Sequence, residues 1–192
     1  EHLTPAAARE HCPALHADRF RGAAYCPTDE FVDPYLALQG YADGCRARGV
    51  DLRVGVEATD VETDAAGRVR GLAWADAEAG GGTGRLDADY VLNAAGPWAG
   101  RVAAMAGVDL PVEPELHRLA FVRPDPPMPE DVPLTVDLDT GSVFRPEADD
   151  VAAVGGHVGD RPTADPDRVP ESVSLDWQLA VLEAVADVCG YF

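Results

Sequence analysis

The chain has 192 residues, of which 46% are hydrophobic, so it is long enough and apolar enough to bury a core. Its formal net charge of -19 disfavours nucleic acid and anionic membranes as partners. The 15 basic residues are all Arg, and an acidic surface without Lys suggests a halophilic host with a salty cytoplasm.

Helix signals open the chain. Thr4 and Pro5 place an N-cap before a proline at the first helical position, which predicts a helix that ends near Pro13. Asp33-Pro34 repeats this pattern ahead of residues 35–49, where apolar side chains recur at helical spacing and Gly49 ends the helix.

Strand signals follow. Residues 51–58, 59–64 and 68–76 are expected to form strands, the last two joined by a hairpin turn at 65–67. Residues 85–96 are expected to enter a buried strand that ends on Ala94-Ala95-Gly96 and leads into a helix over 97–107. The intervening Gly80–Gly84 run follows no buried strand and opens no helix, so it is interpreted as a surface loop.

The pattern changes after Pro111. Four short strands are predicted, at 116–124, 134–138, 142–147 and 151–156, and an amphipathic helix is predicted over 170–190. The expected fold class is therefore α+β. Residues 1–110 would form part of a nucleotide-binding layer with an N-terminal helical segment, and residues 111–192 an antiparallel sheet covered by a helix.

Cysteine spacing and apolar runs exclude several classes of protein. The cysteines are Cys12, Cys26, Cys45 and Cys189. They form no C-x-x-C pair, and Pro13 interrupts any helical face shared by His11, Cys12 and His16, so neither a metal site nor a disulfide framework is expected. No apolar run spans a membrane and no leader peptide is evident, which favours a soluble, cytoplasmic protein.

Several motifs, taken in this order, carry a family resemblance. They are Asp33-Pro34, the Thr59-Asp60-Val61 strand, Asn93-Ala94-Ala95-Gly96-Pro97-Trp98, "TVDLDTGSVFRPE" and "VAAVGG". Together they resemble the middle of the FAD-dependent D-amino-acid oxidase family, the group of sarcosine, dimethylglycine and glycine oxidases. The family's opening G-x-G-x-x-G unit and its closing Gly-rich flavin segment are not found in these 192 residues. We therefore expect an internal fragment that is inactive and does not hold FAD tightly by itself.

The resemblance implies three cofactor contacts. Val61 would contribute backbone hydrogen bonds to the adenine, although a Val in an alternating strand also reads as core. Ala95 and Gly96 would approach the ribose and pyrophosphate, where a larger side chain would collide. Their alternative interpretation is a tight junction between a strand and a helix without a ligand. Trp98 is expected to pack in the core.

Two residues are candidates for substrate binding. Arg145 stands where the family places substrate-lining residues, and a guanidinium suits bidentate capture of a carboxylate. Its alternative role is to neutralise an acidic surface. His117 is a second candidate, or else a structural hydrogen-bond donor. No catalytic residue is identified, because in flavin oxidases the cofactor performs the hydride transfer.

The resemblance implies a function for the full-length protein. It would oxidise the C–N bond of a small amine or amino acid, such as sarcosine or glycine, with FAD as cofactor. A flavin-free binding or interaction domain that keeps the same fold is the alternative of a different class. A glycerol-3-phosphate dehydrogenase-like enzyme is the alternative for the substrate.

Overall fold

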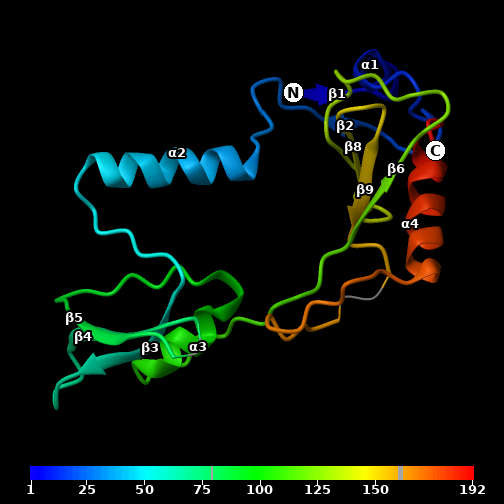
Figure 1. Cartoon of the computed structure of the whole chain (residues 1–192). Coiled ribbons are helices and arrows are strands. Elements are labelled where there is room, and N and C mark those ends of the chain that lie inside the picture. The colour runs from blue at the N-terminus through cyan, green and yellow to red at the C-terminus, as the bar shows by residue number, and fades with distance from the viewer. Residues whose placement is uncertain (79, 160–161) are drawn as a thin grey trace. The chain divides into compact units, whose positions relative to one another are not determined.

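The computed structural model describes residues 1–78, 80–159 and 162–192, and the chain divides into two units (Figure 1). One unit contains Glu1–Asp29 together with Pro114–Phe192, and the other contains Glu30–Glu113.

The helices are α1 (Pro5–His11), α2 (Pro34–Ala47), the 3₁₀ turn η1 (Gly96–Trp98), α3 (Ala99–Met105) and α4 (Leu175–Val188). The strands are β1 (His2–Leu3), β2 (Ala23–Ala24), β3 (Val56–Thr63), β4 (Val69–Asp76), β5 (Thr83–Asp87), β6 (Leu119–Val122), β7 (Thr135–Val136), β8 (Ser142–Pro146) and β9 (Ala152–Gly156). Both helices and antiparallel sheets are present, which confirms the predicted α+β class.

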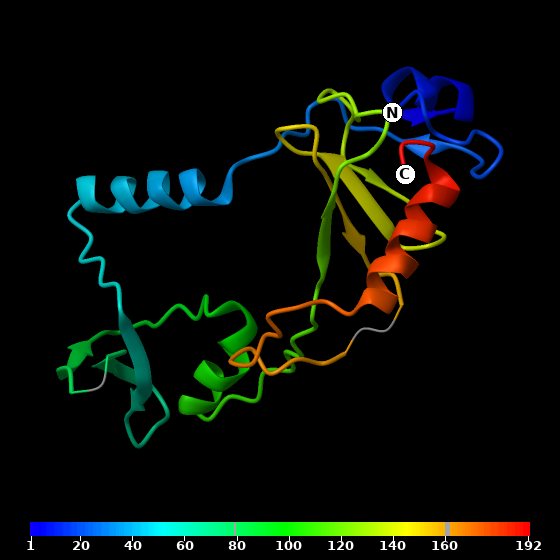
Figure 2. The same ribbon diagram turned by 45° about the vertical axis from the view of Figure 1, so that its right-hand side comes forward.

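A four-stranded antiparallel sheet forms the centre of the first unit, in the order β6-β9-β8-β7. All four strands lie within the ranges predicted from the sequence. The helix α4 lies along one face of this sheet, as Figure 2 shows. The predicted antiparallel sheet with a helix on one face is thus confirmed.

The core of this unit lies between α4 and the sheet. Phe144 of β8 and Val154 of β9 are directly paired and fully buried, and they pack with Val181 and Val185 of α4. The helix begins later than the predicted residue 170, because Ser174 provides the N-cap and its hydroxyl accepts a hydrogen bond from the Trp177 amide at 3.4 Å.

The N-terminal segment belongs to this same unit. Thr4 caps α1 as predicted, and its hydroxyl accepts from the Ala7 amide at 3.3 Å. The pairing of β1 with β2 was not predicted, since neither two-residue strand has a periodic pattern. The division at residue 110 therefore differs from the structure, which groups residues 1–29 with 114–192.

The second unit contains the three-stranded antiparallel sheet β3-β4-β5. In place of the two strands predicted at 51–58 and 59–64 there is the single strand β3, and residues 51–55 lie outside it. The predicted hairpin turn joins β3 to β4. The short helix α3 packs against β3, as Figure 1 shows.

The predicted buried strand over residues 85–96 is wrong. The strand β5 ends at Asp87, and the apolar residues beyond it are exposed: Tyr90 to 91% and Leu92 to 92%. An apolar run becomes a buried strand only where a neighbouring strand accepts its backbone hydrogen bonds. The Ala88 amide still donates to the Arg70 carbonyl of β4 at 3.1 Å, but none of the described strands pairs with residues 89–95. The Gly80–Gly84 run is only partly a loop, because Thr83 and Gly84 begin β5.

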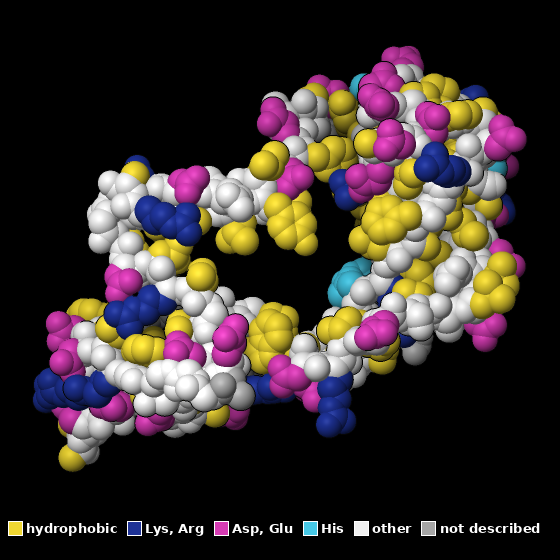
Figure 3. Space-filling view, viewed as in Figure 1, with side chains coloured by type: hydrophobic (Ala, Val, Ile, Leu, Met, Phe, Trp, Pro, Cys, Tyr) yellow, Lys and Arg dark blue, Asp and Glu magenta, His cyan; other side chains and the backbone are white. Residues whose placement is uncertain are grey.

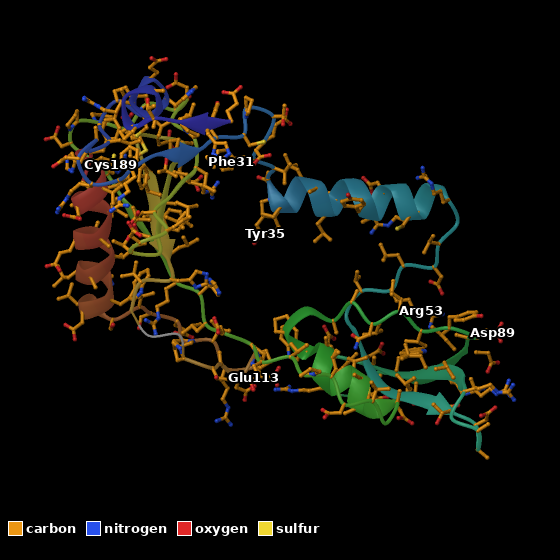
Figure 4. All side chains as sticks on the ribbon, turned by 180° about the vertical axis from the view of Figure 1, so that it is seen from behind. Phe31, Tyr35, Arg53, Asp89, Glu113 and Cys189 are labelled. Atoms are coloured by element: carbon orange, nitrogen blue, oxygen red, sulfur yellow. The ribbon has the colours of Figure 1, made fainter. Side chains whose placement is uncertain are left out.

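The helix α2 has the predicted bounds but buries none of its side chains. The Asp33 carboxylate caps it and accepts from the Tyr35 and Leu36 amides at 2.8 and 2.9 Å. Its apolar stripe is exposed, with Tyr35 at 77% and Tyr41 at 79%. Figure 3 shows hydrophobic side chains along this helix, and Figure 4 shows Tyr35 projecting from its first turn.

Candidate functional site

The cofactor candidate Val61 lies in the middle of β3. It pairs with Leu72 of β4, and only 5% of its surface is exposed. The buried side chain agrees with the interpretation of Val61 as a core residue. That its backbone forms hydrogen bonds to the adenine of FAD stays a prediction.

Ala95 and Gly96 lie at the turn that precedes α3, and Asn93 builds this turn. The Asn93 side-chain oxygen accepts from the Ala95 amide at 3.2 Å, and its amide nitrogen donates to the Ala99 carbonyl at 2.9 Å. Sequence analysis missed this role, although an Asn three residues before a Gly is a recognisable turn signal. The turn lies at the N-terminal end of the η1–α3 segment, where backbone amides face outward.

Gly96 itself has φ +53°, and no atom lies within 4 Å of the position that a Cβ would take. Glycine is therefore favoured here by its own backbone conformation as well as by any close approach of a ligand. The neighbouring Trp98 is 41% exposed, so the prediction that it packs in a core is wrong.

The substrate candidate Arg145 lies on the sheet face opposite α4. Along β8, side chains alternate between the two faces, so Arg145 points away from the core that contains Phe144. Arg145 pairs across the sheet with Ala153, which in turn pairs with Phe121 of β6. Its guanidinium forms an ion pair with Glu147.

The same face carries a row of apolar side chains. The register aligns Val136, Val143, Gly155 and Leu119 across the four strands. Leu119 is 54% exposed and Phe121 65% exposed, whereas Ala153 and Gly155 of the central strand β9 are buried under larger neighbours. Arg145 thus lies beside apolar side chains on this face, an arrangement that suits a small ligand with one carboxylate.

His117 lies two residues before β6, just outside the sheet that contains Arg145. Its ring meets that of His157 edge to face, with centroids 4.8 Å apart and planes at 76°. His117 contacts His157, which lies four residues beyond Ala153, the cross-strand partner of Arg145. An extended backbone of four residues spans about 13 Å. The structure places Arg145 within the sheet and His117 beyond the end of a strand of the same sheet.

A cavity of about 920 Å³ lies elsewhere in the unit that contains Arg145. It is lined by the N-terminal segment, including Phe20 and Tyr25, and by residues 133–139. None of the sequence-predicted site residues lines it. The first part of the motif "TVDLDTGSVFRPE", residues 135–139, lines this cavity, but the five candidate residues do not. The candidate site is therefore described from the candidate residues themselves.

Comparison with known proteins gives the family. The sequence model described as "FAD dependent oxidoreductase" (DAO) matches residues 1–189. Rat mitochondrial dimethylglycine dehydrogenase is 30% identical over 150 residues, which cover 77% of this chain and 17% of that protein. Mouse mitochondrial sarcosine dehydrogenase is 30% identical over 157 residues, which cover 81% of this chain and 16% of that protein.

Solved structures show the same fold. L-proline dehydrogenase from P. horikoshii superposes with a TM-score of 0.79 at 19% identity, over 99% of this chain and 48% of that one. Glycine oxidase from Geobacillus kaustophilus superposes with a TM-score of 0.71 at 25% identity, over 99% of this chain and 46% of that one. The chain therefore spans less than half of these structures and about a sixth of the curated relatives.

Proposed function

The chain belongs to the DAO family of FAD-dependent oxidoreductases, and we propose that it is the middle part of an enzyme that oxidises the C–N bond of an amino acid such as sarcosine or glycine. The proposal depends on one observation, the family match over nearly the whole chain together with relatives that are named for dimethylglycine and sarcosine. When bound, FAD supplies the oxidant and accepts a hydride from the carbon next to nitrogen.

The residues proposed to hold FAD are Val61, Ala95 and Gly96. The turn at Gly96 fits a nucleotide, because glycine has no side chain and no atom beyond its chain neighbours lies within 4 Å of the position that a Cβ would take. Its position ahead of a helix also offers amide donors to a phosphate. In the proposal, Val61 contributes backbone groups of β3 rather than its buried side chain.

Arg145 and His117 are proposed to contact the substrate. The Arg145 guanidinium would bind the substrate carboxylate by exchanging its ion pair with Glu147 for two parallel hydrogen bonds. A small amino acid bound at Arg145 does not reach His117 directly, so His117 would contact it through a bound water.

We further propose that the chain holds FAD only as part of a longer protein and that this protein is cytoplasmic. The 192-residue chain by itself does not retain FAD, because the family's pyrophosphate-binding unit is not found in its sequence. Within the residues that the structure describes, no helix is both long and apolar enough to cross a membrane. The proposed location is the cytoplasm, and the charge of -19 fits a halophilic host.

Anaerobic mixing of the full-length gene product with candidate substrates tests this function. The flavin absorbance band is followed after addition of sarcosine, dimethylglycine, glycine or glycerol 3-phosphate. Bleaching by one of the amino acids is the expected result. Bleaching by glycerol 3-phosphate alone would replace the substrate class, and a purified product without flavin would favour a flavin-free binding domain.

A further inference from the structure

Three potential metal ligands meet where the chain enters β6 and leaves β9. They are Glu115, His117 and His157, and their ligand atoms all lie within 4.8 Å of one another. We propose that these residues bind one divalent transition-metal ion of the Zn²⁺ class. The site uses His117, so a bound ion would replace the substrate contact proposed for that residue. The test below measures bound metal and not amine oxidation, so its outcome is separate from that of the amine-oxidising function.

Backbone pairing fixes the positions of the three residues. Leu119 pairs with Gly155 at the end of the β6–β9 ladder, and just beyond it the rings of His117 and His157 meet with centroids 4.8 Å apart. Glu115 forms an isolated bridge with Thr163, and the Leu116 amide donates to the Pro162 carbonyl at 3.1 Å. The ligands are therefore set by strand pairing before any ion binds, which lowers the entropy lost on binding.

Hydrogen bonds also hold the segment that carries His157. The His157 amide donates to the Gly141 carbonyl at 2.8 Å. One residue further on, the Val158 carbonyl accepts a hydrogen bond from the Trp177 indole at 3.1 Å. Trp177 is 94% buried in the core, so His157 extends from a rigid support.

The chemistry of the ligand set favours a transition metal over Mg²⁺ or Ca²⁺. Two imidazoles and one carboxylate are typical ligands of Zn²⁺, whereas hard cations prefer oxygen ligands throughout. Ligand atoms around tetrahedral Zn²⁺ lie about 3.3 Å apart, as follows from bonds of about 2.0–2.1 Å. The three side chains are exposed, so rotation about their own side-chain bonds is free to bring them that much closer.

Space and charge at this place are compatible with an ion. A cavity of about 10 Å³ is lined by the three ligands together with Leu116, Arg118, Gly156, Val158 and Trp177. This volume is about that of one water molecule, and hence of one small ion. The Arg118 guanidinium, which also lines this cavity, lies over the Trp177 ring at 5.8 Å. Within the described parts of the chain Glu115 makes no ion pair, so its carboxylate is available to a metal ion. The net charge of -19 further attracts cations.

Equilibrium dialysis against Zn²⁺ in the presence of excess Mg²⁺ tests the proposal. Mg²⁺ occupies exposed carboxylates but does not displace an ion held by imidazoles. The purified protein is expected to retain one Zn²⁺ per chain. His157→Ala and Glu115→Gln are each expected to weaken Zn²⁺ affinity on the order of 10–100-fold or more.

Matched variants separate a built site from general attraction to an acidic protein. His2→Ala removes an exposed imidazole elsewhere, and Glu113→Gln removes a carboxylate two residues from Glu115. Both are expected to leave the affinity unchanged. His157→Gln, which keeps the side-chain size, replaces His157→Ala if circular dichroism shows that the alanine variant is unfolded. Loss of bound Zn²⁺ in Mg²⁺, or equal affinities in all the variants, would overturn the proposal.

Discussion

The sulfur atoms of Cys12 and Cys189 lie 4.0 Å apart, although 177 positions separate the two residues in sequence. Cys12 is the C-cap of α1 and Cys189 is the C-cap of α4. Figure 4 shows Cys189 beside the N-terminal segment. Backbone hydrogen bonds join the two segments, from the His16 amide to the Val188 carbonyl at 2.8 Å and from the Gly190 amide to the Ala14 carbonyl at 2.9 Å. This contact explains why the N-terminal segment belongs to the unit that contains α4.

The thiol contact makes folding stability depend on pH. The hydrogen bond with Cys189, followed by burial, raises the pKa of Cys12 above its ordinary value of 9.0, whereas the same hydrogen bond lowers the pKa of Cys189 below 9.0. The Cys189 contribution is gained below pH 9.0, so above that pH the protonated Cys12 thiol decides the slope. Since the folded state keeps a proton on Cys12 that the unfolded state releases, the Cys12 contribution is complete below pH 9.0 and is lost as the pH rises further. Burial also raises the pKa of Tyr191 above 10.0, which acts in the same direction.

We expect the free energy of unfolding to fall above pH 9, and to fall less steeply in Cys12→Ala. Urea denaturation at a series of alkaline pH values measures both slopes. Cys26→Ala is the control, because Cys26 is exposed and its thiol lies against Thr28. A wild type and a Cys12→Ala variant with the same slope would show that the Cys12 thiol does not control this pH dependence.

Phe144 is expected to be the largest single contributor to the core of the unit that contains α4. Its ring is fully buried and meets that of Phe192 edge to face, with centroids 5.4 Å apart. Phe144→Ala is expected to lower the free energy of unfolding by about 3–5 kcal/mol. Leu179→Ala is the control on the adjacent helix, where Leu179 is 50% exposed, and it is expected to cost less than about 1 kcal/mol. Denaturant midpoints at constant slope measure both effects, and similar losses would contradict this description of the core.

Local signals in the sequence predicted most of the elements correctly. The caps Thr4 and Asp33 define where α1 and α2 begin, and both form the expected side-chain hydrogen bonds. The hairpin between β3 and β4 and the four strands β6 to β9 also follow from nearby residues. In each of these places the interaction that decides the structure lies within a few residues of the pattern that predicts it.

The failures concern interactions with distant partners. Tyr90 and Leu92 look like a buried strand, but burial depends on a neighbouring strand that the local pattern cannot supply. The grouping of residues 1–29 with α4 depends on the contact of Cys12 with Cys189. Likewise, the meeting of His117 with His157 depends on the register of β6 and β9, and no short turn of fixed geometry links these strands.

Asp64 is expected to hold the hairpin between β3 and β4. Its carboxylate accepts from the Arg68 amide at 3.0 Å and the Ala66 amide at 2.9 Å, and pairs with the Arg70 guanidinium at 2.6 Å. The Arg68 backbone hydrogen bond, followed by the Arg70 contact, lowers the pKa of Asp64 below its ordinary value of 3.8. The resulting stabilisation is present above pH 3.8 and is lost as the pH falls through the lowered pKa.

Asp64→Asn is therefore expected to speed hydrogen exchange of the β3 and β4 amides at neutral pH. The difference from wild type is expected to shrink as the pH falls below 3.8, where the wild-type carboxylate becomes protonated. Asp60→Asn serves as the control, because Asp60 is an exposed carboxylate of the same strand. Exchange rates measured by NMR that respond equally to both substitutions would contradict a specific role for Asp64.

Gly96→Asn in the full-length enzyme is expected to reduce the FAD content of the purified protein. Asn tolerates a positive φ, so it fills the space at Gly96 with less backbone strain than a branched residue. Gly107→Asn is the matched control, since Gly107 also has a positive φ, of +71°, and open space around it. The ratio of flavin absorbance to protein absorbance is the measurement. Equal flavin content in the two variants would leave Gly96 with a conformational role only.

Arg145→Ala in the full-length enzyme is expected to leave FAD bound and to raise KM for the amino-acid substrate. Removing one member of a desolvated charge pair costs about 2–5 kcal/mol, which corresponds to a loss in kcat/KM of roughly 30-fold to 4,000-fold. Arg145→Lys keeps the charge but loses the bidentate geometry, so an intermediate loss is expected. Arg123→Ala is the control, because Arg123 is an exposed arginine near the same sheet that donates to the Asp149 carbonyl at 2.7 Å.

The ion pair of Arg145 with Glu147 gives a second way to separate the two interpretations of this arginine. If the guanidinium binds substrate, Glu147→Gln frees it from a competing carboxylate, and KM is expected to fall or stay constant while Arg145→Ala raises it. If the arginine serves only to neutralise the acidic surface, both substitutions affect stability and neither changes kcat/KM. Steady-state kinetics on the two variants, with flavin content measured on the same samples, therefore decide whether an amino-acid carboxylate binds at Arg145.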